Sequence, residues 1–312
     1  MTPTPAPAAM SGKPSRLPGY FIATVGLVFA LVVWGGIVRL SGSGLAIPDW
    51  PLAHGKFIPY RPETRVMIEF IHRVLAMIVG FATLGLAVAV YRDPRHRRAL
   101  GGPMAVALVI LAIQILMGGR VVLEELKVDR VVAHLLLAFF FFAILLRMTL
   151  RAQDLARGAE GVASGGPALS RRAKGLRTWS HAAAGLVFLQ SGLGAWVSSS
   201  GAALACPDFP TCHGTLFPRM EGLVGIHYAH RLGAYLIFAT VLALSIRAAS
   251  APLPPRARWP LRLAGVLVAL QIFLGVGNVV LSLPLAVSAG HLATALALFG
   301  TLLVSSHELK RL

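Results

Sequence analysis

Eight stretches of mostly apolar residues follow one another along the chain, separated by short polar segments. They lie at residues 20–40, 66–91, 99–119, 130–150, 177–198, 223–247, 261–282 and 286–306. A helical run of about twenty apolar residues matches the hydrocarbon thickness of a bilayer. The pattern therefore predicts an all-α integral membrane protein with eight transmembrane helices. The first run is too long for a signal-peptide core and has no clear cleavage site, so we expect it to remain as a membrane helix.

The composition supports the membrane class and excludes a soluble domain. Of 312 residues, 56% are hydrophobic and only 13% are charged, which is far too apolar for an ordinary soluble protein. The formal net charge of +17 would suit a nucleic-acid partner, but the basic residues are spread over short loops between apolar runs. Lysine and arginine gathered beside membrane helices explain the charge better. We therefore expect a lipid bilayer as the environment and no nucleic-acid partner.

The basic residues also predict how the chain crosses the membrane. They concentrate at both termini and in the connections after the second, fourth and sixth runs. The positive-inside rule then places these segments and both termini in the cytoplasm. The connections at 41–65, 120–129, 199–222 and 283–285 are expected to face outward.

The two halves of the sequence repeat each other at an offset of 157 to 159 residues. The segment 41–51 aligns with 200–210, the segment 114–118 aligns with 271–275, and His134 falls opposite His291. A duplicated four-helix unit predicts two tandem pseudo-symmetric four-helix bundles with the same orientation in the membrane. The expected parts are a disordered N-terminus at 1–19, an N-terminal half at 20–150, a linker at 151–176, a C-terminal half at 177–306 and a tail at 307–312.

Four histidines lie near the outer ends of four of the predicted helices, two in each half. They are His72, His134, His230 and His291. At about 1.5 Å per residue, each imidazole is expected roughly 5–10 Å below the outer surface. Two histidines at matching depth on different helices are what a haem iron bound by two imidazoles needs. We therefore expect these four residues to bind haem iron, one pair in each half.

Two other interpretations of the histidines are open at this point. A single histidine at such a position can be a hydrogen-bonded polar residue at a helix interface. An isolated zinc ion would need a third clustered ligand, which none of the outward connections supplies. Four histidines in duplicated pairs favour haem.

Glu69 is the clearest difference between the halves, because its counterpart is His227. It lies one turn from His72 on the same helical face, and a charged group in a membrane-length apolar run is a functional hypothesis by default. It could move protons or stabilise a developing cation, or it could only pair with Arg73 or Arg65. The asymmetry predicts reaction chemistry in the first half and electron transfer in the second.

Three arginines near the outer ends of helices are candidates for binding haem propionates. Arg73 and Arg231 each follow a histidine directly, and Arg39 ends the first apolar run. Charge-assisted hydrogen bonds would hold the carboxylates there, although simple snorkelling to the interface is the other interpretation. Gln114 and Gln271 are predicted to form hydrogen bonds between helices.

Cys206 and Cys212 are the two cysteines of the chain, and both lie in one outward connection. A structural disulfide is expected there, since such a loop faces an oxidising compartment in most bacteria. Covalent haem attachment is not expected, because position 209 carries no cysteine to complete the motif. The equivalent positions in the first half, Ile47 and Ala53, cannot form a bridge.

Together, these motifs resemble the haem A synthase family over nearly the whole chain. The matching segments in the first half are Gly35-Gly36-Ile37-Val38-Arg39-Leu40 with Ser43-Gly44-Leu45, Glu69-Phe70-Ile71-His72-Arg73, and Gln114 through Val122 leading to His134. In the second half they are Ser200-Gly201 through Cys206-Pro207-Asp208, His230-Arg231, and Leu283-Pro284-Leu285 leading to His291.

The resemblance implies an oxidoreductase of haem biosynthesis that serves cytochrome c oxidase assembly. The implied reaction oxidises the C8 methyl of haem O to a formyl group, giving haem A. His230 and His291 would ligate a resident haem b, His72 and His134 would face the haem O substrate, and Glu69 matches a glutamate important for activity. The implied location is the bacterial inner membrane, multi-pass, with haem sites toward the extracytoplasmic side. Partners would be haem O synthase (the protohaem farnesyltransferase) and an unidentified electron donor.

One departure and two alternatives accompany this resemblance. Some family members carry a cysteine pair in the first outward loop, where this chain has Ile47 and Ala53, so electrons must reach the site by another route. The first alternative is a two-haem electron carrier, linked to quinol, that does not modify haem. The second is a transporter, which duplicated four-helix halves also suit.

Overall fold

The computed structural model describes residues 16–59, 63–158 and 166–312, and within them the chain is helical almost throughout. Eight helices of this described part are long and apolar enough to cross a membrane. Their bounds are α1 Leu17–Leu40, α2 Thr64–Arg92, α3 Pro94–Leu123, α4 Val128–Ala156, α5 Pro167–Ser199, α6 Gly222–Ala249, α7 Pro255–Val280 and α8 Leu285–Lys310, with a short 3₁₀ helix η1 at Ala202–Leu204. The expected all-α membrane architecture is confirmed.

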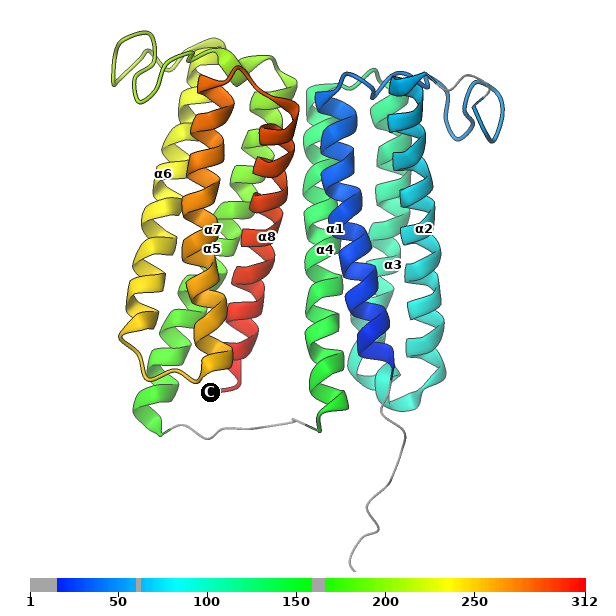
Figure 1. Ribbon diagram of the computed structural model, residues 1–312. Helices are drawn as coiled ribbons and strands as arrows, with labels where there is room; N and C mark the ends of the chain where they lie inside the picture. Colours follow the sequence, from blue (N-terminus) through cyan, green and yellow to red (C-terminus); the bar gives the residue numbers. More distant parts are fainter. Residues whose placement is uncertain (1–15, 60–62, 159–165) are drawn as a thin grey trace, which may run out of the picture.

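Figure 1 shows the helices as two groups of four, α1–α4 and α5–α8, standing side by side. Inside each group, sequential helices pack on one another and the first packs on the last. The two groups meet through α1 and α4 of the first and α5 and α8 of the second. The loop segments 41–59 and 200–221 project from the same end of the molecule, opposite the end where the chain terminates (Figure 1).

Local signals in the sequence explain where several helices begin and end. α1, α3, α5 and α7 each have proline in their first turn, where the missing N–H has no helical partner to lose. The Asp93 carboxylate accepts a hydrogen bond from the Arg95 backbone and caps α3. α1 and α5 are followed by Gly42 and Gly201 at φ +68° and +79°, a conformation that glycine adopts without steric cost.

The contact between the two groups is aromatic in its middle. The rings of Phe139 on α4 and Phe299 on α8 lie 5.6 Å apart, and Phe188 on α5 lies 6.1 Å from Phe299. Apolar side chains also cover the outer surface, where Phe81 and Phe273 are strongly exposed. A surface of this kind is stable in lipid and not in water.

The helices extend beyond the predicted apolar runs, most of all around the expected linker at 151–176. α4 continues to Ala156, α5 already begins at Pro167, and residues 159–165 lie outside the described part. Polar residues continue these helices because they find partners there: Asp154 on α4 is 3.0 Å from His307 and 2.9 Å from Arg311. Of the N-terminal segment expected to be disordered, residues 1–15 also lie outside the described part, and α1 begins at Leu17.

Candidate functional site

The four histidines singled out in the sequence line one cavity between the helices. Its volume is about 1430 Å³, larger than the roughly 300–1,000 Å³ of an ordinary small-molecule site. His72 enters it from α2, His134 from α4, His230 from α6 and His291 from α8. The cavity draws its lining from both four-helix groups, so it offers two histidines from each to a large ligand.

Each of these imidazoles lies against a glycine of the preceding helix. A Cβ atom built on that glycine would come within 3.0 to 3.3 Å of the imidazole Cε1, closer than side chains ordinarily approach. The pairs are Gly35 with His72, Gly118 with His134, Gly194 with His230 and Gly275 with His291. Only a residue without a side chain lets the ring lie this close to the helix backbone, so the glycines fix the depth of each imidazole.

Glutamine side chains on the odd-numbered helices contact three of the four histidines. The Gln190 amide nitrogen lies 3.0 Å from Nδ1 of His230 and donates to the His230 carbonyl at 2.7 Å. The Gln271 amide nitrogen lies 3.1 Å from Nε2 of His291. Gln114 donates to the His134 carbonyl at 3.1 Å, so the predicted interhelical role of Gln114 and Gln271 is confirmed.

His72 is the exception among the four. The residue of α1 that corresponds to Gln190 is Leu31, an apolar residue that lines the cavity. Nδ1 of His72 is buried and has no hydrogen-bond partner within the described residues. The imidazole of the first half is therefore held less firmly than its counterpart in the second.

The residues of the cavity suit a planar ligand whose metal takes axial nitrogen donors. The buried Nδ1 atoms of His134 and His291, like that of His72, lack protein partners in the described part of the chain. A buried imidazole nitrogen without a partner costs free energy unless a ligand or metal satisfies it. No three of His, Cys, Asp and Glu gather into a compact cluster among the described residues, so no site of the kind that binds a zinc ion is observed there.

Glu69 lies where the cavity meets the loop between α1 and α2, and it is 3% exposed. Its carboxylate accepts a hydrogen bond from the Ile47 backbone at 2.9 Å and pairs with Arg73 at 2.7 Å. Arg73 in turn donates to the carbonyls of Ile47, Asp49 and Leu52. Of the two partners considered from sequence, Arg73 is therefore the one observed, and the pair fastens the loop over the cavity.

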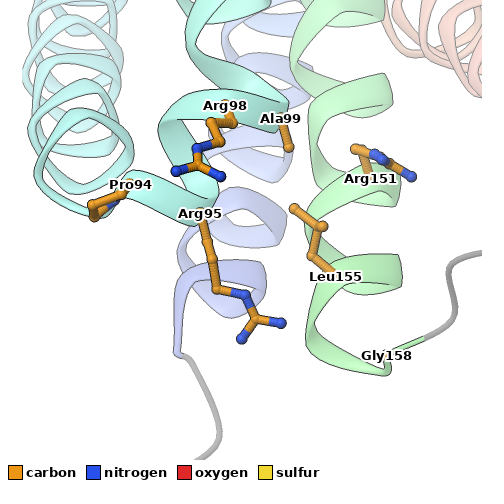
Figure 2. Close-up of a pocket in the computed structure, with 7 residues that line it drawn as sticks. All are labelled: Pro94, Arg95, Arg98, Ala99, Arg151, Leu155 and Gly158. Atoms are coloured by element: carbon orange, nitrogen blue, oxygen red, sulfur yellow. The ribbon is translucent and has the colours of Figure 1, made fainter.

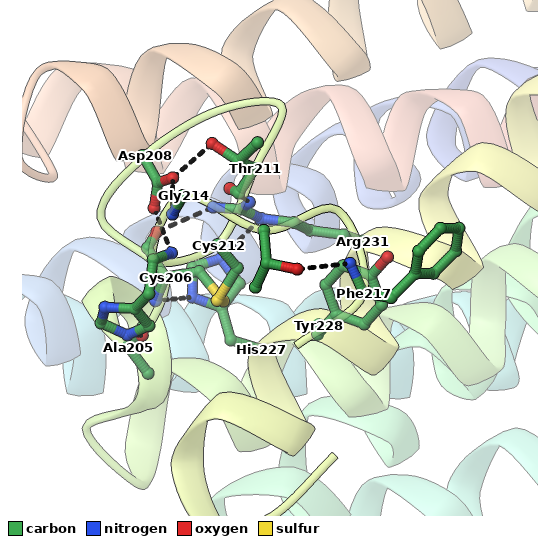
Figure 3. The surroundings of a disulfide bond; sticks show 12 residues. Ala205, Cys206, Asp208, Thr211, Cys212, Gly214, Phe217, His227, Tyr228 and Arg231 are labelled. Atoms are coloured by element: carbon green, nitrogen blue, oxygen red, sulfur yellow. Dashed lines mark hydrogen bonds between the residues drawn. A yellow bond between two sulfur atoms is a disulfide. The ribbon is translucent and has the colours of Figure 1, made fainter. Parts of the chain in front are cut away.

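The second half builds the same clamp from different residues, as Figure 3 shows. His227 stands in place of Glu69, with its Nδ1 3.3 Å from the Cys206 backbone nitrogen. Arg231 approaches His227 and donates to the carbonyls of Thr211 and Cys206. In both halves an arginine thus attaches the loop to the helix below it. Only the first half has a carboxylate, that of Glu69, beside this arginine.

The α1–α2 and α5–α6 loops also share an aspartate that organises their turns. Asp49 accepts hydrogen bonds from the Gly55 and His54 backbones, which lower the pKa of its carboxyl below the ordinary value. In the second loop, Asp208 accepts hydrogen bonds from the Thr211 hydroxyl and from the backbones of Gly214 and His213. These bonds lower the pKa of its carboxyl.

The predicted disulfide is present, joining Cys206 and Cys212 in the second loop (Figure 3). Both sulfur-bearing side chains are fully buried. Their first-half equivalents, Ile47 and Ala53, are also buried and pack with Val66 on α2. Apolar packing therefore occupies the place that the disulfide takes in the second loop.

Arg39 connects the two halves at the end of the cavity that carries the histidines. It donates to the backbone carbonyl of Ser198 at 2.9 Å and also to the Ser198 hydroxyl. Ser198 occupies the position of the second half that corresponds to Arg39 itself. All three arginines named from sequence, Arg39, Arg73 and Arg231, line the cavity, each already bonded to protein groups.

Sequence reasoning missed Gln190, although a signal for it exists. A glutamine precedes the histidine-facing glycine by four residues in α3, α5 and α7, so that both lie on one helical face. The pairs are Gln114 with Gly118, Gln190 with Gly194 and Gln271 with Gly275. In α1, the residue four positions before Gly35 is Leu31, so a leucine stands where the other three helices have a glutamine.

Comparison with known proteins extends this picture to a family. The family model described as "Cytochrome oxidase assembly protein" matches residues 19–303. A protein named "Heme A synthase" from Alkalihalophilus pseudofirmus is 30% identical over 233 residues, which cover 74% of this chain and 76% of the relative. Proteins of the same name from Nitrosospira multiformis and Rhizorhabdus wittichii are 28% and 26% identical, covering 91% and 98% of this chain and 91% and 97% of their own lengths. The chain therefore belongs to the haem A synthase family of cytochrome oxidase assembly proteins.

Proposed function

We propose that this protein is a haem A synthase, which oxidises the C8 methyl group of haem O to a formyl group and so supplies haem A for cytochrome c oxidase. The observation that carries the proposal is the set of four histidines, in two pairs, around one large apolar cavity. A cavity of this kind accommodates a hydrophobic macrocycle and offers its iron axial nitrogen ligands. The relatives named for this activity support the same substrate class.

The two halves take different roles in this proposal. His230 and His291 hold a resident haem b, and His72 with His134 receives the haem O substrate. The glutamine contacts support this division, because both second-half histidines are held by Gln190 and Gln271, whereas His72 has no such partner in the described chain. A permanent cofactor benefits from fixed ligands, and a substrate that must leave as product benefits from a looser one.

Glu69 is the proposed catalytic acid–base group of the first half. It lines the cavity one turn from His72, and its carboxylate is fixed by Arg73 and the Ile47 backbone. A carboxylate held in this way can accept a proton or stabilise a developing positive charge on a bound substrate. His227 occupies the same place in the second half, where only electron transfer is proposed.

The remaining site residues are proposed to bind the haem groups and to orient them in the cavity. The guanidinium groups of Arg39, Arg73 and Arg231 line the cavity and are proposed to pair with haem propionates. A bound haem b would supply one-electron transfer to the first half, which suits a chain whose first loop has Ile47 and Ala53 in place of cysteines. We propose the bacterial inner membrane as the location, with the haem sites on the extracytoplasmic side, and haem O synthase and an electron donor as partners.

The histidine pairs alone would also serve a two-haem electron carrier, and one experiment separates the two functions. The protein is expressed with a haem O-producing enzyme in a host that lacks haem A, and non-covalent haems are extracted and identified by chromatography and mass. Wild-type protein is expected to yield haem A. Haem b with unchanged haem O would contradict the synthase and favour the carrier.

Two substitutions at one residue test the role of Glu69 in the same assay. Glu69→Gln and Glu69→His are both expected to abolish haem A while haem b stays bound, and the histidine variant copies the clamp of the second half. Glu63→Gln, at an exposed position just before α2, is the matched control and should keep full activity. Haem A formation by Glu69→His would show that the carboxylate is only a loop anchor.

A further inference from the structure

A second cavity lies at the opposite end of the first four-helix group, away from the histidines. Its volume is about 560 Å³, and it is formed by the start of α3 and the end of α4. Along α4, Arg151 is separated from His134 by roughly 25 Å at the usual helical rise. Figure 2 shows Arg95 and Arg98 on the first turns of α3, with Leu155 projecting toward them from the last turns of α4.

The charged residues known to line this pocket are positive. Arg95, Arg98 and Arg151 line it, and none of its lining residues in the described part of the chain is acidic. The neighbouring carboxylates are directed elsewhere, because Asp93 caps α3 and pairs with His96, and Asp154 pairs with His307 and Arg311. Within the described part of the chain, the guanidinium groups of Arg95 and Arg98 have no hydrogen-bond or ion-pair partner.

The second half provides an internal comparison. At the offset that relates His134 to His291, Arg151 corresponds to Glu308. Glu308 lies 3.8 Å from Arg256 and 3.9 Å from Arg311, so a carboxylate of the protein balances the arginines there. The first half has arginines at this end of the molecule and an arginine in place of that carboxylate. An anion from outside the chain would pair with Arg95 and Arg98 at this end of the first half.

We propose that this pocket binds the phosphate group of an anionic phospholipid. Arginine forks match the several oxygens of a phosphate, and basic pockets between the ends of membrane helices are where lipid head groups are held. Ala99 and Leu155 give the pocket an apolar wall for the glycerol and the first acyl carbons. The site is independent of the haem chemistry proposed above, and its occupant would fasten α3 to α4.

Lipid titration of the full-length protein tests the proposal. Protein in detergent is titrated with phosphatidylglycerol or with zwitterionic phosphatidylcholine, and bound lipid is counted by native mass spectrometry. Wild-type protein is expected to retain phosphatidylglycerol in preference to phosphatidylcholine. The double variant Arg95→Gln/Arg98→Gln should bind it roughly thirtyfold more weakly, since each basic group near the surface contributes about fivefold.

A charge-matched control separates the pocket from general attraction. Arg171→Gln/Arg172→Gln removes two exposed arginines from α5 and should leave phosphatidylglycerol binding unchanged. Equal loss in both double variants would overturn the proposal, as would equal binding of the two lipids. Inorganic phosphate that binds the wild type without any retained lipid would identify a site for a free anion and would also overturn it.

A milder variant keeps the test informative if the double variant folds poorly. Arg95→Lys/Arg98→Lys preserves the charge and loses the planar fork, so lipid binding is expected to weaken by only a few-fold. Leu155→Trp fills the space beside the arginines without changing charge, and it should displace the lipid. Unchanged lipid binding by the tryptophan variant would place the lipid elsewhere and overturn the proposal.

Discussion

The side-chain amide of Gln190 on α5 reaches both the ring and the backbone of His230 on α6, at 3.0 Å from Nδ1 and 2.7 Å from the carbonyl oxygen. The equivalent residue in α1 is Leu31, and His72 has no comparable partner among the described residues. Equivalent histidines of the two halves therefore differ in the hydrogen bonds that hold them. In the proposed function, this difference separates a fixed haem ligand from one that must exchange its haem.

We predict that Gln190→Leu weakens haem retention in the second half. A hydrogen bond of this kind contributes about 0.5–1.5 kcal/mol, so haem should leave the purified protein roughly two- to tenfold faster. The midpoint potential of the remaining haem should also shift, because the bond sets the basicity of the His230 ring. Transfer of haem to apomyoglobin and a redox titration measure the two effects.

Leu31→Gln provides the matched control, since it places the glutamine in the first half. It should leave the second-half haem unchanged in both measurements. If Gln190→Leu changes neither rate nor potential, Gln190 serves helix packing only.

We predict that Gly194→Ala disturbs the second-half haem more than Gly35→Ala disturbs the first-half site. The added methyl would lie 3.0 Å from Cε1 of His230 or His72, respectively, so each ring must move by a few tenths of an ångström. The ring of His230 is hydrogen-bonded to Gln190, whereas no glutamine of the described chain holds the ring of His72. Haem content per protein and the Soret spectrum report the difference.

Gly185→Ala is the control for the helix itself, because nothing lies within 4 Å of a methyl group at that position of α5. Replacing glycine by alanine in a helix interior without steric conflict is stabilising by about 0.4–1 kcal/mol. A loss of haem in Gly185→Ala equal to that in Gly194→Ala would contradict the steric explanation.

We predict a structural role for the disulfide between Cys206 and Cys212. The cysteines are 6 positions apart, and closing so short a loop stabilises the folded state by about 2 kcal/mol in the chain-entropy model. Cys206→Ala/Cys212→Ala should therefore lower the thermal stability of the loop and retain haem A formation, since Asp208 and Arg231 still hold the loop. Loss of haem A formation in a fully folded double variant would instead assign the cysteines a redox role.

The hydrogen bonds of Asp208 predict how the α5–α6 loop responds to acid. Hydrogen bonds from Thr211 and Gly214 lower the pKa of Asp208 in the folded state. A lowered folded pKa means that the stabilisation is fully present above the unfolded value and is lost as the pH falls through the folded value. Hydrogen-exchange protection of the His213 and Gly214 backbones should thus be constant from about pH 5 to 8 and decline only below the ordinary value of 3.8.

Asp208→Asn tests this assignment directly. The amide can still accept hydrogen bonds, but it carries no charge, so protection of His213 and Gly214 should be lower at neutral pH and independent of pH in the acid range. Asp129→Asn, at an exposed position of α4 paired with Arg130, should behave as the wild type. A variant at Asp208 with the wild-type acid profile would show that another group controls the loop.

The sequence alone determined the helices and their duplication. Runs of about twenty apolar residues can satisfy their backbone groups in lipid only as helices, so eight such runs specify eight membrane helices. A fixed offset between His72 and His230, and between Gln114 and Gln271, identifies the repeated unit. The disulfide could also be predicted from sequence, because Cys206 and Cys212 lie within one short loop.

Tertiary structure decided which side chains meet. A helix that is apolar on all sides gives no signal of which face turns inward, so the contact of Gln190 with His230 and that of Arg39 with Ser198 could not be read from periodicity. The same holds for Arg95, Arg98 and Arg151, which look like ordinary loop-flanking charges until α3 and α4 pack together. These contacts join residues 40 to 159 positions apart, and they depend on helix rotation and depth, which packing of the whole bundle sets.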